Sequence, residues 1–306
     1  MTLYYTPQTT MEALDILQET AGKARIIGGG TDLLPEIRAG KTVPETLVDI
    51  SNIPELNQIR IETNQVTIGA GVNFAAIKDH PVLNELVPML TAAAASIGAG
   101  AIQQTATWGG NLVQAMPAAD GAIAALALEA ELRILDSKGE RWEPVENIFL
   151  GPGQSSLDPS KELLAAIRFS YPDNQWWGTA WKRIGRRSAL ILPIMNCAVK
   201  LLPRQTQNEI QIVRAVIALG PAGQVPFRAN KAEKSLQNMP INEDYFQQAG
   251  IITRDESQPR GNPLRASREY RLDVIPVLVC SALKEAAEQI QTQSEVLNRS
   301  INRSME

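Results

Sequence analysis

Two glycine-rich segments contain the residue types that can hold a phosphate group. The first is Ile26-Ile-Gly-Gly-Gly-Thr-Asp-Leu-Leu34, in which three glycines follow an apolar run. Without side chains, consecutive backbone amides can turn toward one point and approach a phosphate closely, and the Thr31 hydroxyl adds a donor. The pattern therefore predicts an anion-binding turn. A tight turn that needs glycine only for positive φ fits this segment equally well when it is taken alone.

The second segment, Thr105-Ala-Thr-Trp-Gly-Gly-Asn-Leu112, repeats the same order of hydroxyl, glycines and a polar side chain, and Asp120 follows it closely. Two separate donor-rich turns suit a diphosphate that links two nucleotide halves, because each turn can hold part of the charge. Neither segment is a Rossmann fingerprint, since the first runs Gly28-x-Gly30-x-x-Leu33 and lacks the third glycine. No Walker lysine follows a glycine loop either, so another mode of nucleotide binding is expected.

Composition excludes several classes of protein. The 306 residues carry a formal net charge of −4, whereas proteins that mainly bind nucleic acid usually have a strongly basic surface. One histidine and two distant cysteines cannot form a zinc site or hold an iron–sulfur cluster, so no metal site is expected and any redox cofactor must be organic. No nucleophile–base constellation is apparent. No segment has the roughly 20 apolar residues of a membrane span, and no signal peptide is visible, so we expect a cytoplasmic protein.

Apolar periodicity predicts an α+β protein. A helix that begins at Thr9 or Thr10, a strand at 24–27 and a strand at 46–50 indicate a small βαβ unit. Strands at 65–68 and 131–135 are expected to alternate with helices at 83–96 and 120–129, and Ser137-Lys-Gly-Glu140 is typical of a hairpin turn. Strand-like runs follow at 180–184, 194–202 and 213–219, and helices are expected near 229–237 and at 273–293.

These patterns divide the chain into four parts. We expect a small N-terminal βαβ lobe at 1–55, a larger α+β lobe at 56–175, a domain of antiparallel sheet plus helices at 176–293, and a frayed polar tail at 294–306. Trp176, Trp177 and Trp181 cluster where the third part begins. Core or seam packing is expected of them rather than stacking on a cofactor.

Nearly the whole chain resembles the FAD-binding medium subunits of molybdenum hydroxylases, of the xanthine dehydrogenase and carbon monoxide dehydrogenase type. The strongest likeness is Ile102-Gln-Gln-Thr-Ala-Thr-Trp-Gly-Gly-Asn-Leu-Val-Gln-Ala-Met-Pro-Ala-Ala-Asp120, which is similar to the family's Ile-x-Asn-x-Ala-Thr-Ile-Gly-Gly-Asn-Leu segment and the Pro-Ala-Ala-Asp after it. Tyr5-Thr-Pro7, the Gly-Gly-Gly-Thr-Asp-Leu loop and Lys182-Arg-Ile-Gly-Arg-Arg-Ser-Ala-Leu190 agree with it. The resemblance implies the FAD-binding fold of vanillyl-alcohol oxidase, with two α+β lobes that hold FAD and a C-terminal domain.

The resemblance also implies roles for individual residues. The first glycine loop would line the pyrophosphate and ribityl region, the second loop would form another clamp, and Asp120 would hydrogen-bond the ligand's polar middle or ring edge. Leu164 would pack on the isoalloxazine ring, and Lys182 would approach its polar edge, where a cation stabilises the anionic reduced flavin. The implied FAD-binding residues are Gly28, Gly29, Gly30, Thr31, Asp32, Leu33, Thr107, Gly109, Gly110, Asn111, Asp120, Leu164 and Lys182.

Three positions bear on how the cofactor is held. Trp108 stands where the family has a small aliphatic residue, and Ile97 stands where eukaryotic members have an aromatic residue that stacks on the flavin. His80 lies between Asp79 and Pro81 in a segment typical of a surface turn, although a histidine can tether flavin covalently in the wider fold. We therefore expect non-covalent FAD and altered packing of the second loop.

By the family's pattern, the chain itself carries no catalytic acid–base pair. A large partner subunit would hold the molybdenum cofactor, a small one would hold 2Fe–2S clusters, and the assembly would be a dimer of heterotrimers. Electrons would reach an external acceptor through the FAD of this chain. The acceptor stays open between nicotinamide, quinone, ferredoxin and oxygen. A stand-alone FAD oxidoreductase of the same fold and a flavin-free scaffold are the alternatives.

Overall fold

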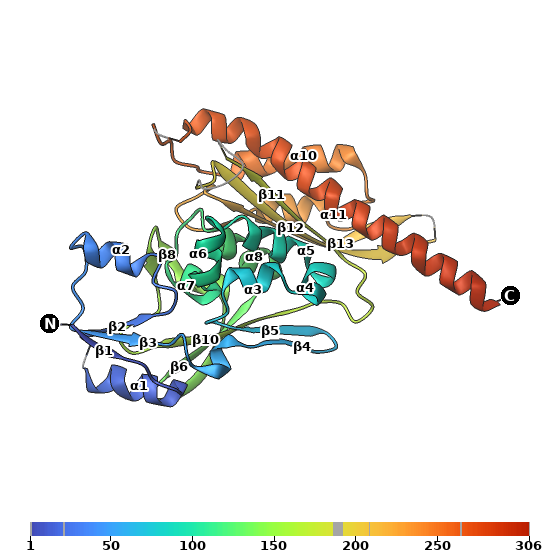
Figure 1. Ribbon diagram of the computed structural model, residues 1–306. Helices are drawn as coiled ribbons and strands as arrows, with labels where there is room; N and C mark the ends of the chain where they lie inside the picture. The colour runs from blue at the N-terminus through green and yellow to red at the C-terminus, as the bar shows by residue number, and fades with distance from the viewer. Residues whose placement is uncertain (1, 21, 186–191, 208, 264, 306) are drawn as a thin grey trace.

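The computed structural model describes residues 2–20, 22–185, 192–207, 209–263 and 265–305, with side chains described as far as residue 295. Four sheets and eleven α-helices are present in these ranges (Figure 1). The mixture of sheets with segregated helices confirms the α+β fold that the sequence predicts. No helix in these ranges is both long enough and apolar enough to cross a membrane.

The first sheet is parallel and has the order β1-β3-β2, with β1 at Leu3–Tyr5, β2 at Ala24–Ile27 and β3 at Thr46–Asp49. Helix α1 (Thr10–Glu19) begins at the predicted cap, where the Thr9 side chain accepts a hydrogen bond from the backbone N–H of Glu12. A short helix, α2 (Leu33–Arg38), follows the first glycine loop, where the sequence predicted only a polar connection.

The second sheet is antiparallel and has the order β4-β5-β10-β6-β7. Its strands are β4 (Ile59–Ile61), β5 (Gln65–Gly69), β6 (Glu131–Asp136), β7 (Gly139–Pro144) and β10 (Leu163–Ser170). Pairing of Asp136 with Gly139 confirms the predicted hairpin between β6 and β7. The small hairpin of β8 (Phe149–Gly151) and β9 (Gln154–Ser155) follows β7, and 3₁₀ turns lie at Pro54–Asn57 and Val145–Ile148.

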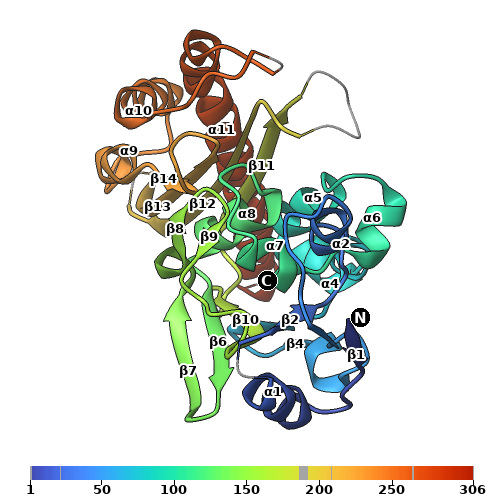
Figure 2. The same ribbon diagram turned by 90° about the vertical axis from the view of Figure 1, so that its left-hand side faces the viewer.

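Six short helices cover the second sheet: α3 (Phe74–Lys78), α4 (Pro81–Leu86), α5 (Pro88–Ala95), α6 (Gly100–Thr105), α7 (Trp108–Val113) and α8 (Asp120–Leu128). The single helix predicted over 83–96 is wrong, because Pro88 cannot continue the helix before it and starts a new one. All nine residues of α8 are buried, since α8 lies between the second sheet and the third (Figure 2).

The third sheet is antiparallel and has the order β11-β12-β13-β14, with β11 at Gly178–Ile184, β12 at Met195–Gln205, β13 at Ile210–Gly220 and β14 at Phe227–Arg228. Helices α9 (Asn230–Leu236) and α11 (Arg268–Met305) pack on it, and α10 (Glu243–Glu256) packs on α9 and α11. Helix α10 was not predicted. Helix α11 is longer than the predicted 273–293, so the expected frayed tail at 294–306 is helical as far as Met305.

The three tryptophans pack at the seam before the third sheet, as predicted. Trp177 and Trp181 are buried, and the indole Nε1 of Trp181 donates to the Ser96 hydroxyl at 2.9 Å. The indole of Trp176 donates to the backbone carbonyl of Ile290 in α11 at 3.2 Å. These contacts join β11 and the segment before it to α11 and to the helices of the second sheet.

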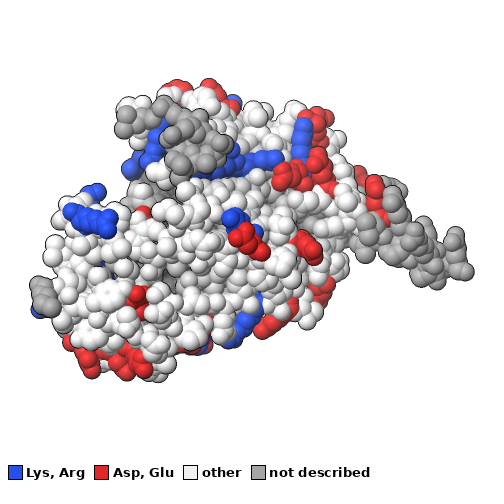
Figure 3. Space-filling view, viewed as in Figure 1, with Lys and Arg blue, Asp and Glu red and all other residues white. Residues whose placement is uncertain are grey.

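Charge is not spread evenly over the molecule. Figure 3 shows Lys and Arg side chains along the upper part of one face, over the C-terminal elements, and Asp and Glu side chains at the lower left, over α1.

Candidate functional site

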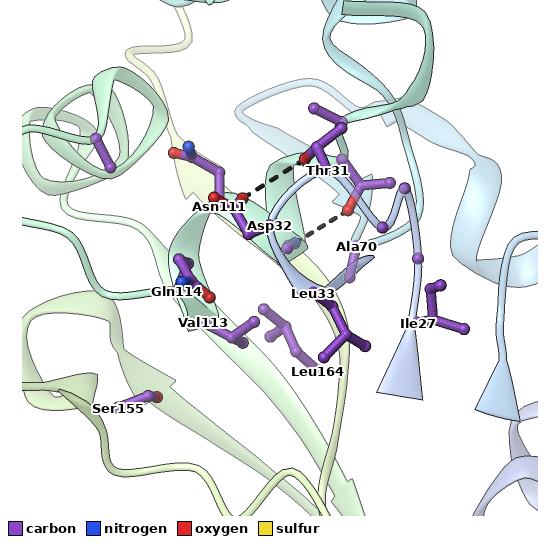
Figure 4. A pocket seen from close by; sticks show the side chains of 18 of the residues that line it. Ile27, Thr31, Asp32, Leu33, Ala70, Asn111, Val113, Gln114, Ser155 and Leu164 are labelled. Atoms are coloured by element: carbon purple, nitrogen blue, oxygen red, sulfur yellow. Dashed lines mark hydrogen bonds between the residues drawn. The ribbon is translucent and has the colours of Figure 1, made fainter. Parts of the chain in front are cut away.

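One cavity of about 880 Å³ lies where the two glycine loops meet. This volume is at the upper end of the range for small-molecule and cofactor sites, which is roughly 300–1,000 Å³. Its walls come from the loop after β2, the start of α2, helices α6 to α8, the β8–β9 hairpin, the start of β10 and the end of β11 (Figure 4). The predicted site residues that line it are Gly28, Gly29, Gly30, Thr31, Asp32, Leu33, Thr107, Gly109, Gly110, Asn111, Asp120 and Leu164.

The first glycine loop presents unused backbone donors to this cavity. The N–H groups of residues 28–32 donate to no acceptor in the described part of the chain, and the first turn of α2 closes only with the Leu34 N–H, which donates to the Gly30 carbonyl at 3.0 Å. Gly30 has φ +65°, a left-handed conformation that favours glycine. A run of free amides at a helix start is the geometry that holds an anion.

A carboxyl group lies beside this run of amides. Asp32 is the cap residue of α2, but its side chain does not cap the helix, and the Thr31 hydroxyl donates to it at 3.5 Å (Figure 4). Partial burial and the nearby Glu36 carboxylate raise the pKa of Asp32 above its usual value. The loop therefore combines donors for an anion with a carboxyl that is easier than usual to protonate.

The protein itself uses most of the backbone amides of the second loop, unlike those of the first. The Trp108 and Gly109 N–H groups donate to the carbonyls of Val72 and Ala70, at 3.0 and 3.1 Å. The Gly110 N–H donates to the Thr107 hydroxyl at 3.0 Å, so Thr107 caps α7. The second loop is thus no second amide cradle. It forms a wall of the cavity.

Glycine in both loops is needed for close packing. A Cβ on Gly29 would lie 1.8 Å from the Thr105 carbonyl oxygen, and a Cβ on Gly109 would lie 2.6 Å from the Ala70 carbonyl oxygen. Real Cβ atoms do not approach backbone this closely. A Cβ on Gly28 would meet only the Thr107 side chain, at 3.4 Å, which is an ordinary contact. The first loop therefore rests directly on the segment that leads into the second.

Asn111 contributes a buried polar atom that lacks a partner. Its side-chain Oδ1 is inaccessible to solvent and accepts no hydrogen bond from the described residues. A buried amide normally has its hydrogen bonds satisfied. Because no solvent reaches this oxygen, it does not face the open cavity, and Asn111 lines the cavity through other atoms.

Asp120 lies at the first turn of α8 and is only 5% exposed. Asn196 of β12 donates to its Oδ1, and the Arg183 Nε lies 3.5 Å from its Oδ2. Burial raises the pKa of Asp120 to about 6, although Arg183 and Asn196 both stabilise the ionised form. The cavity thus holds a carboxyl that can change protonation near neutral pH.

Lys182 does not line the cavity, contrary to the prediction. Its ammonium group pairs with Glu285 of α11 on the other face of the third sheet. The next residue, Arg183, lines the cavity instead, because successive side chains on a strand point to opposite faces. Nothing in the sequence indicated which of these two neighbours would face the cavity.

The other positions singled out in the sequence have clear places. Ile97 lines the cavity, whereas Trp108 is fully buried behind the second loop, where its Nε1 donates to the Gly121 carbonyl at 3.0 Å. His80 lies outside the cavity and caps α4 by accepting the Leu83 N–H at its Nδ1. Leu164 sits beside a register shift in the pairing of β10 with β6, which changes the direction of side chains there.

The residues of this site are suited to binding a ligand. Amide donors, buried polar side chains and apolar walls surround the cavity, and no group of His, Cys, Asp or Glu able to hold a metal ion occurs in the described ranges. The sequence did not single out Arg183, Gln114, Ser155 and Glu162 as site residues, although Arg183 and Gln114 lie in segments that resemble the family.

Two family models together match most of the chain. The FAD binding domain in molybdopterin dehydrogenase matches residues 1–172, and the CO dehydrogenase flavoprotein C-terminal domain matches residues 180–286. Similar proteins include caffeine dehydrogenase subunit beta from Pseudomonas sp., 31% identical over 79% of this chain and 80% of the relative. The xanthine dehydrogenase FAD-binding subunit of Escherichia coli O157:H7 is 29% identical over 92% of this chain and 95% of its own length.

Solved structures agree with these matches. A chain of carbon monoxide dehydrogenase from Hydrogenophaga pseudoflava is 26% identical and superimposes with a TM-score of 0.86, covering 94% of this chain and 98% of that chain. A chain of quinoline 2-oxidoreductase from Pseudomonas putida 86 is 25% identical, with a TM-score of 0.85 over 95% and 98% of the two chains. The chain therefore belongs to the family of FAD-binding flavoprotein subunits of molybdenum hydroxylases, which are oxidoreductases.

Proposed function

We propose that this chain binds FAD non-covalently and passes electrons from an iron–sulfur cluster of a partner subunit to an external acceptor. The observation that carries the proposal is the row of unused amides at residues 28–32, which opens into a cavity of cofactor size. FAD supplies the two-electron chemistry when it is bound. Family membership favours this function over a stand-alone flavin oxidoreductase.

The residues of the cavity fit the parts of FAD. The amides of the Gly28–Asp32 loop hold the diphosphate, and the N-terminus of α2 adds its favourable dipole. Asn111 adds a polar residue to the cavity wall. Leu164 and Ile97 provide apolar contact for a ring, and Asp120 binds a polar edge. Thr107, Gly109 and Gly110 shape the wall rather than bind the charge.

The partners follow from the relatives. Similar proteins include the carbon monoxide dehydrogenase medium chain of Hydrogenophaga pseudoflava and the beta subunit of caffeine dehydrogenase. These names support a place for this chain beside a large molybdenum-binding subunit and a small 2Fe–2S subunit. We expect heterotrimers paired into dimers, in the cytoplasm. On this proposal, lobes 1–55 and 56–175 hold the cofactor, and the domain at 176–293 closes one wall of the cavity.

An absorption spectrum of the purified chain tests the proposal. The full chain is incubated with excess FAD and desalted, and retained flavin bands support the site. The informative variant is Gly28→Leu, because residue 28 lines the cavity and its Cβ has ordinary contacts. Its control is Gly100→Leu, at a glycine outside the cavity with nothing within 4 Å of its Cβ position.

The outcomes separate binding from folding. Loss of flavin in Gly28→Leu, with retention in Gly100→Leu and equal melting temperatures, supports the site. A wild-type chain that retains no flavin, either alone or co-expressed with its large and small subunits, contradicts the proposal. Retention of flavin by Gly28→Leu at wild-type affinity contradicts the placement of the cofactor in this cavity.

A further inference from the structure

The outer strand of the first sheet carries exposed apolar side chains. Strand β1 pairs with β3 on one side and with no described strand on the other. Its residues Leu3, Tyr4 and Tyr5 are 50%, 56% and 42% exposed. The Leu3 N–H donates to the Glu45 carbonyl at 2.8 Å, on the side of β3. Because successive residues of a strand turn their backbone groups to opposite sides, the N–H and carbonyl of Tyr4 face the open edge.

Two further exposed apolar residues lie on the segments that flank β1. Val43 is 81% exposed and precedes Pro44, whose carbonyl accepts the Thr2 hydroxyl at 3.1 Å, so Val43 lies near the start of the strand. Met11 is 66% exposed in the first turn of α1, which lies below β1 in both Figure 1 and Figure 2. We call this surface the β1 edge; its residues are Leu3, Tyr4, Tyr5, Met11 and Val43. Grouped apolar side chains on an open strand are typical of a protein interface.

Helix α1, which adjoins the β1 edge, is acidic. It carries Glu12, Asp15 and Glu19, all of them exposed, and no lysine or arginine occurs between residues 10 and 19. Figure 3 shows acidic side chains gathered at the lower left, over α1. A carboxylate at the C-terminal end of a helix opposes the helix dipole, so Glu19 does not stabilise α1. The negative charge of this helix is therefore available to another molecule.

This charge selects among the molecules that could cover the β1 edge. Nucleic acid and anionic membrane surfaces are negatively charged, so α1 repels them. In a symmetric dimer the same patch occurs on both copies, so two acidic helices would lie against each other. An extended apolar segment flanked by lysine or arginine complements both the open strand and the acidic helix.

We propose that the β1 edge binds a partner subunit through an extended apolar segment flanked by basic residues. The proposal rests on the proposed assembly with a large and a small subunit. The apolar side chains of the edge supply the buried contact, the Tyr4 backbone hydrogen-bonds the added segment, and α1 attracts its basic residues and speeds association. None of the five residues of the β1 edge lines the cavity, so this contact is separate from cofactor binding.

Affinity for the purified pair of large and small subunits tests this inference. The FAD-loaded full chain is titrated with the pair, by biolayer interferometry, at low and high salt. Asp15→Lys combined with Glu19→Lys should weaken binding about tenfold at low salt, through slower association, and much less at high salt. Lysine at position 19 suits the helix dipole, so this variant should fold. Leu3→Thr combined with Met11→Gln keeps good strand and helix formers and should weaken binding about tenfold at either salt concentration.

The matched control is Val277→Gln combined with Glu288→Lys. Val277 is 70% exposed, and both residues lie on α11, on the opposite side of the molecule from β1 in Figure 1. Losses of affinity in both edge variants but not in the control, with equal FAD retention and melting temperatures, support the inference.

Three results overturn the inference. The first is wild-type affinity in both edge variants, and the second is an equal loss in the control. The third is a wild-type chain that dimerises alone and becomes monomeric in the Leu3 and Met11 variant, because the occupant is then a second copy. A wild-type chain that retains FAD but does not bind the pair of subunits would instead contradict the proposed assembly itself, so the two failures are distinguishable.

Discussion

Asn196 donates a hydrogen bond from its Nδ2 to Oδ1 of Asp120 at 2.5 Å and so joins strand β12 to the start of α8. Asn196 is fully buried and Asp120 nearly so, and the residues lie 76 positions apart. Arg183, the cross-strand neighbour of Asn196, approaches the same carboxyl. The Asp120 side chain, at the cavity wall, therefore helps to attach the third sheet to α8.

Asp120 should make the stability of the apoprotein depend on pH. Burial raises its pKa to about 6 in the folded protein, above the value in the unfolded chain, so the folded state binds more protons between about pH 4 and pH 6. Stability from this group therefore falls as pH rises through that interval. The variant Asp120→Asn does not titrate at this position and so lacks this loss. Its free energy of unfolding, taken relative to that of wild type, should therefore rise with pH across this interval. The total rise is roughly 3 kcal/mol, because each unit of difference between the folded and unfolded pKa is worth about 1.4 kcal/mol.

Urea denaturation at pH 4.5, 6 and 8 measures this difference. Asp158→Asn is a control of opposite sign, because hydrogen bonds from Ser160 and the Lys161 ammonium hold the pKa of Asp158 down to about 2. The Asp158 carboxylate stabilises the folded protein at pH values above the pKa that Asp158 has in the unfolded chain. This stability is lost as the pH falls. A parallel pH profile for Asp120→Asn and wild type would show that Asp120 ionises normally.

Gly29→Ala should destroy FAD binding, whereas Gly28→Ala should not. The added Cβ at position 29 would overlap the Thr105 carbonyl oxygen, so the first loop must move away from the second. At position 28 the new methyl group makes an ordinary contact with Thr107. We expect at least a hundredfold weaker FAD binding for Gly29→Ala and less than about threefold for Gly28→Ala, in flavin fluorescence titrations. Similar affinities for the two variants would mean that the loops do not need this close packing.

Trp108→Phe should lower stability and leave FAD affinity nearly unchanged. The substitution removes the indole donor of the Gly121 carbonyl and leaves unfilled volume in the core, at a cost of about 1–3 kcal/mol. The Trp108 side chain lies behind the second loop and outside the cavity lining. Thermal melting checks the expected loss of stability, and FAD titration of the same preparation checks the expected affinity. A large loss of affinity without a loss of stability is the contrary result.

Glu129→Gln should destabilise the protein strongly. Burial opposes ionisation of Glu129, but Lys200, Arg228 and Arg214 outweigh it and hold its pKa below the usual range. Lys200 is itself buried, with Nζ 2.8 Å from the Glu129 carboxylate. Removing one partner of such a pair leaves a buried charge and costs about 3–5 kcal/mol.

The matched experiment adds Lys200→Met to Glu129→Gln. Methionine removes the buried cation while keeping an apolar side chain of similar length, so the double variant should recover most of the loss in chemical denaturation. If the loss of stability in the double variant equals the sum of the losses in the two single variants, Glu129 and Lys200 do not act as a unit.

Local patterns were sufficient for much of the fold. Thr9 is a side-chain cap that the sequence displays, and the β6–β7 hairpin follows from its turn residues. Helix α10 was missed because its buried face is made of small or polar residues, Ala249, Gly250 and Thr253, beside Phe246. Its cap, Asn242, accepts a hydrogen bond from the Asp244 N–H and was a usable signal.

The site was less predictable than the fold, because its details depend on residues distant in sequence. The glycine loops were identified from the order of their residues, but the carbonyls of Ala70 and Val72 decide that the Gly109 and Trp108 amides are not available to a ligand. Likewise, strand alternation predicts that Lys182 and Arg183 point apart. The packing of α11 and of the helices of the second sheet against β11 decides which of them faces the cavity.

The position of β10 has a consequence for how the protein is made. Strand β10 lies in the middle of the second sheet, between β5 and β6, yet it is the last strand of that sheet in the chain. During synthesis, β5 and β6 have no shared strand to pair with until residue 170 has left the ribosome. Leu164, on this strand, lines the cavity. The nascent chain therefore cannot load its cofactor early, and a ribosome stalled before β10 leaves an open sheet edge exposed to chaperones.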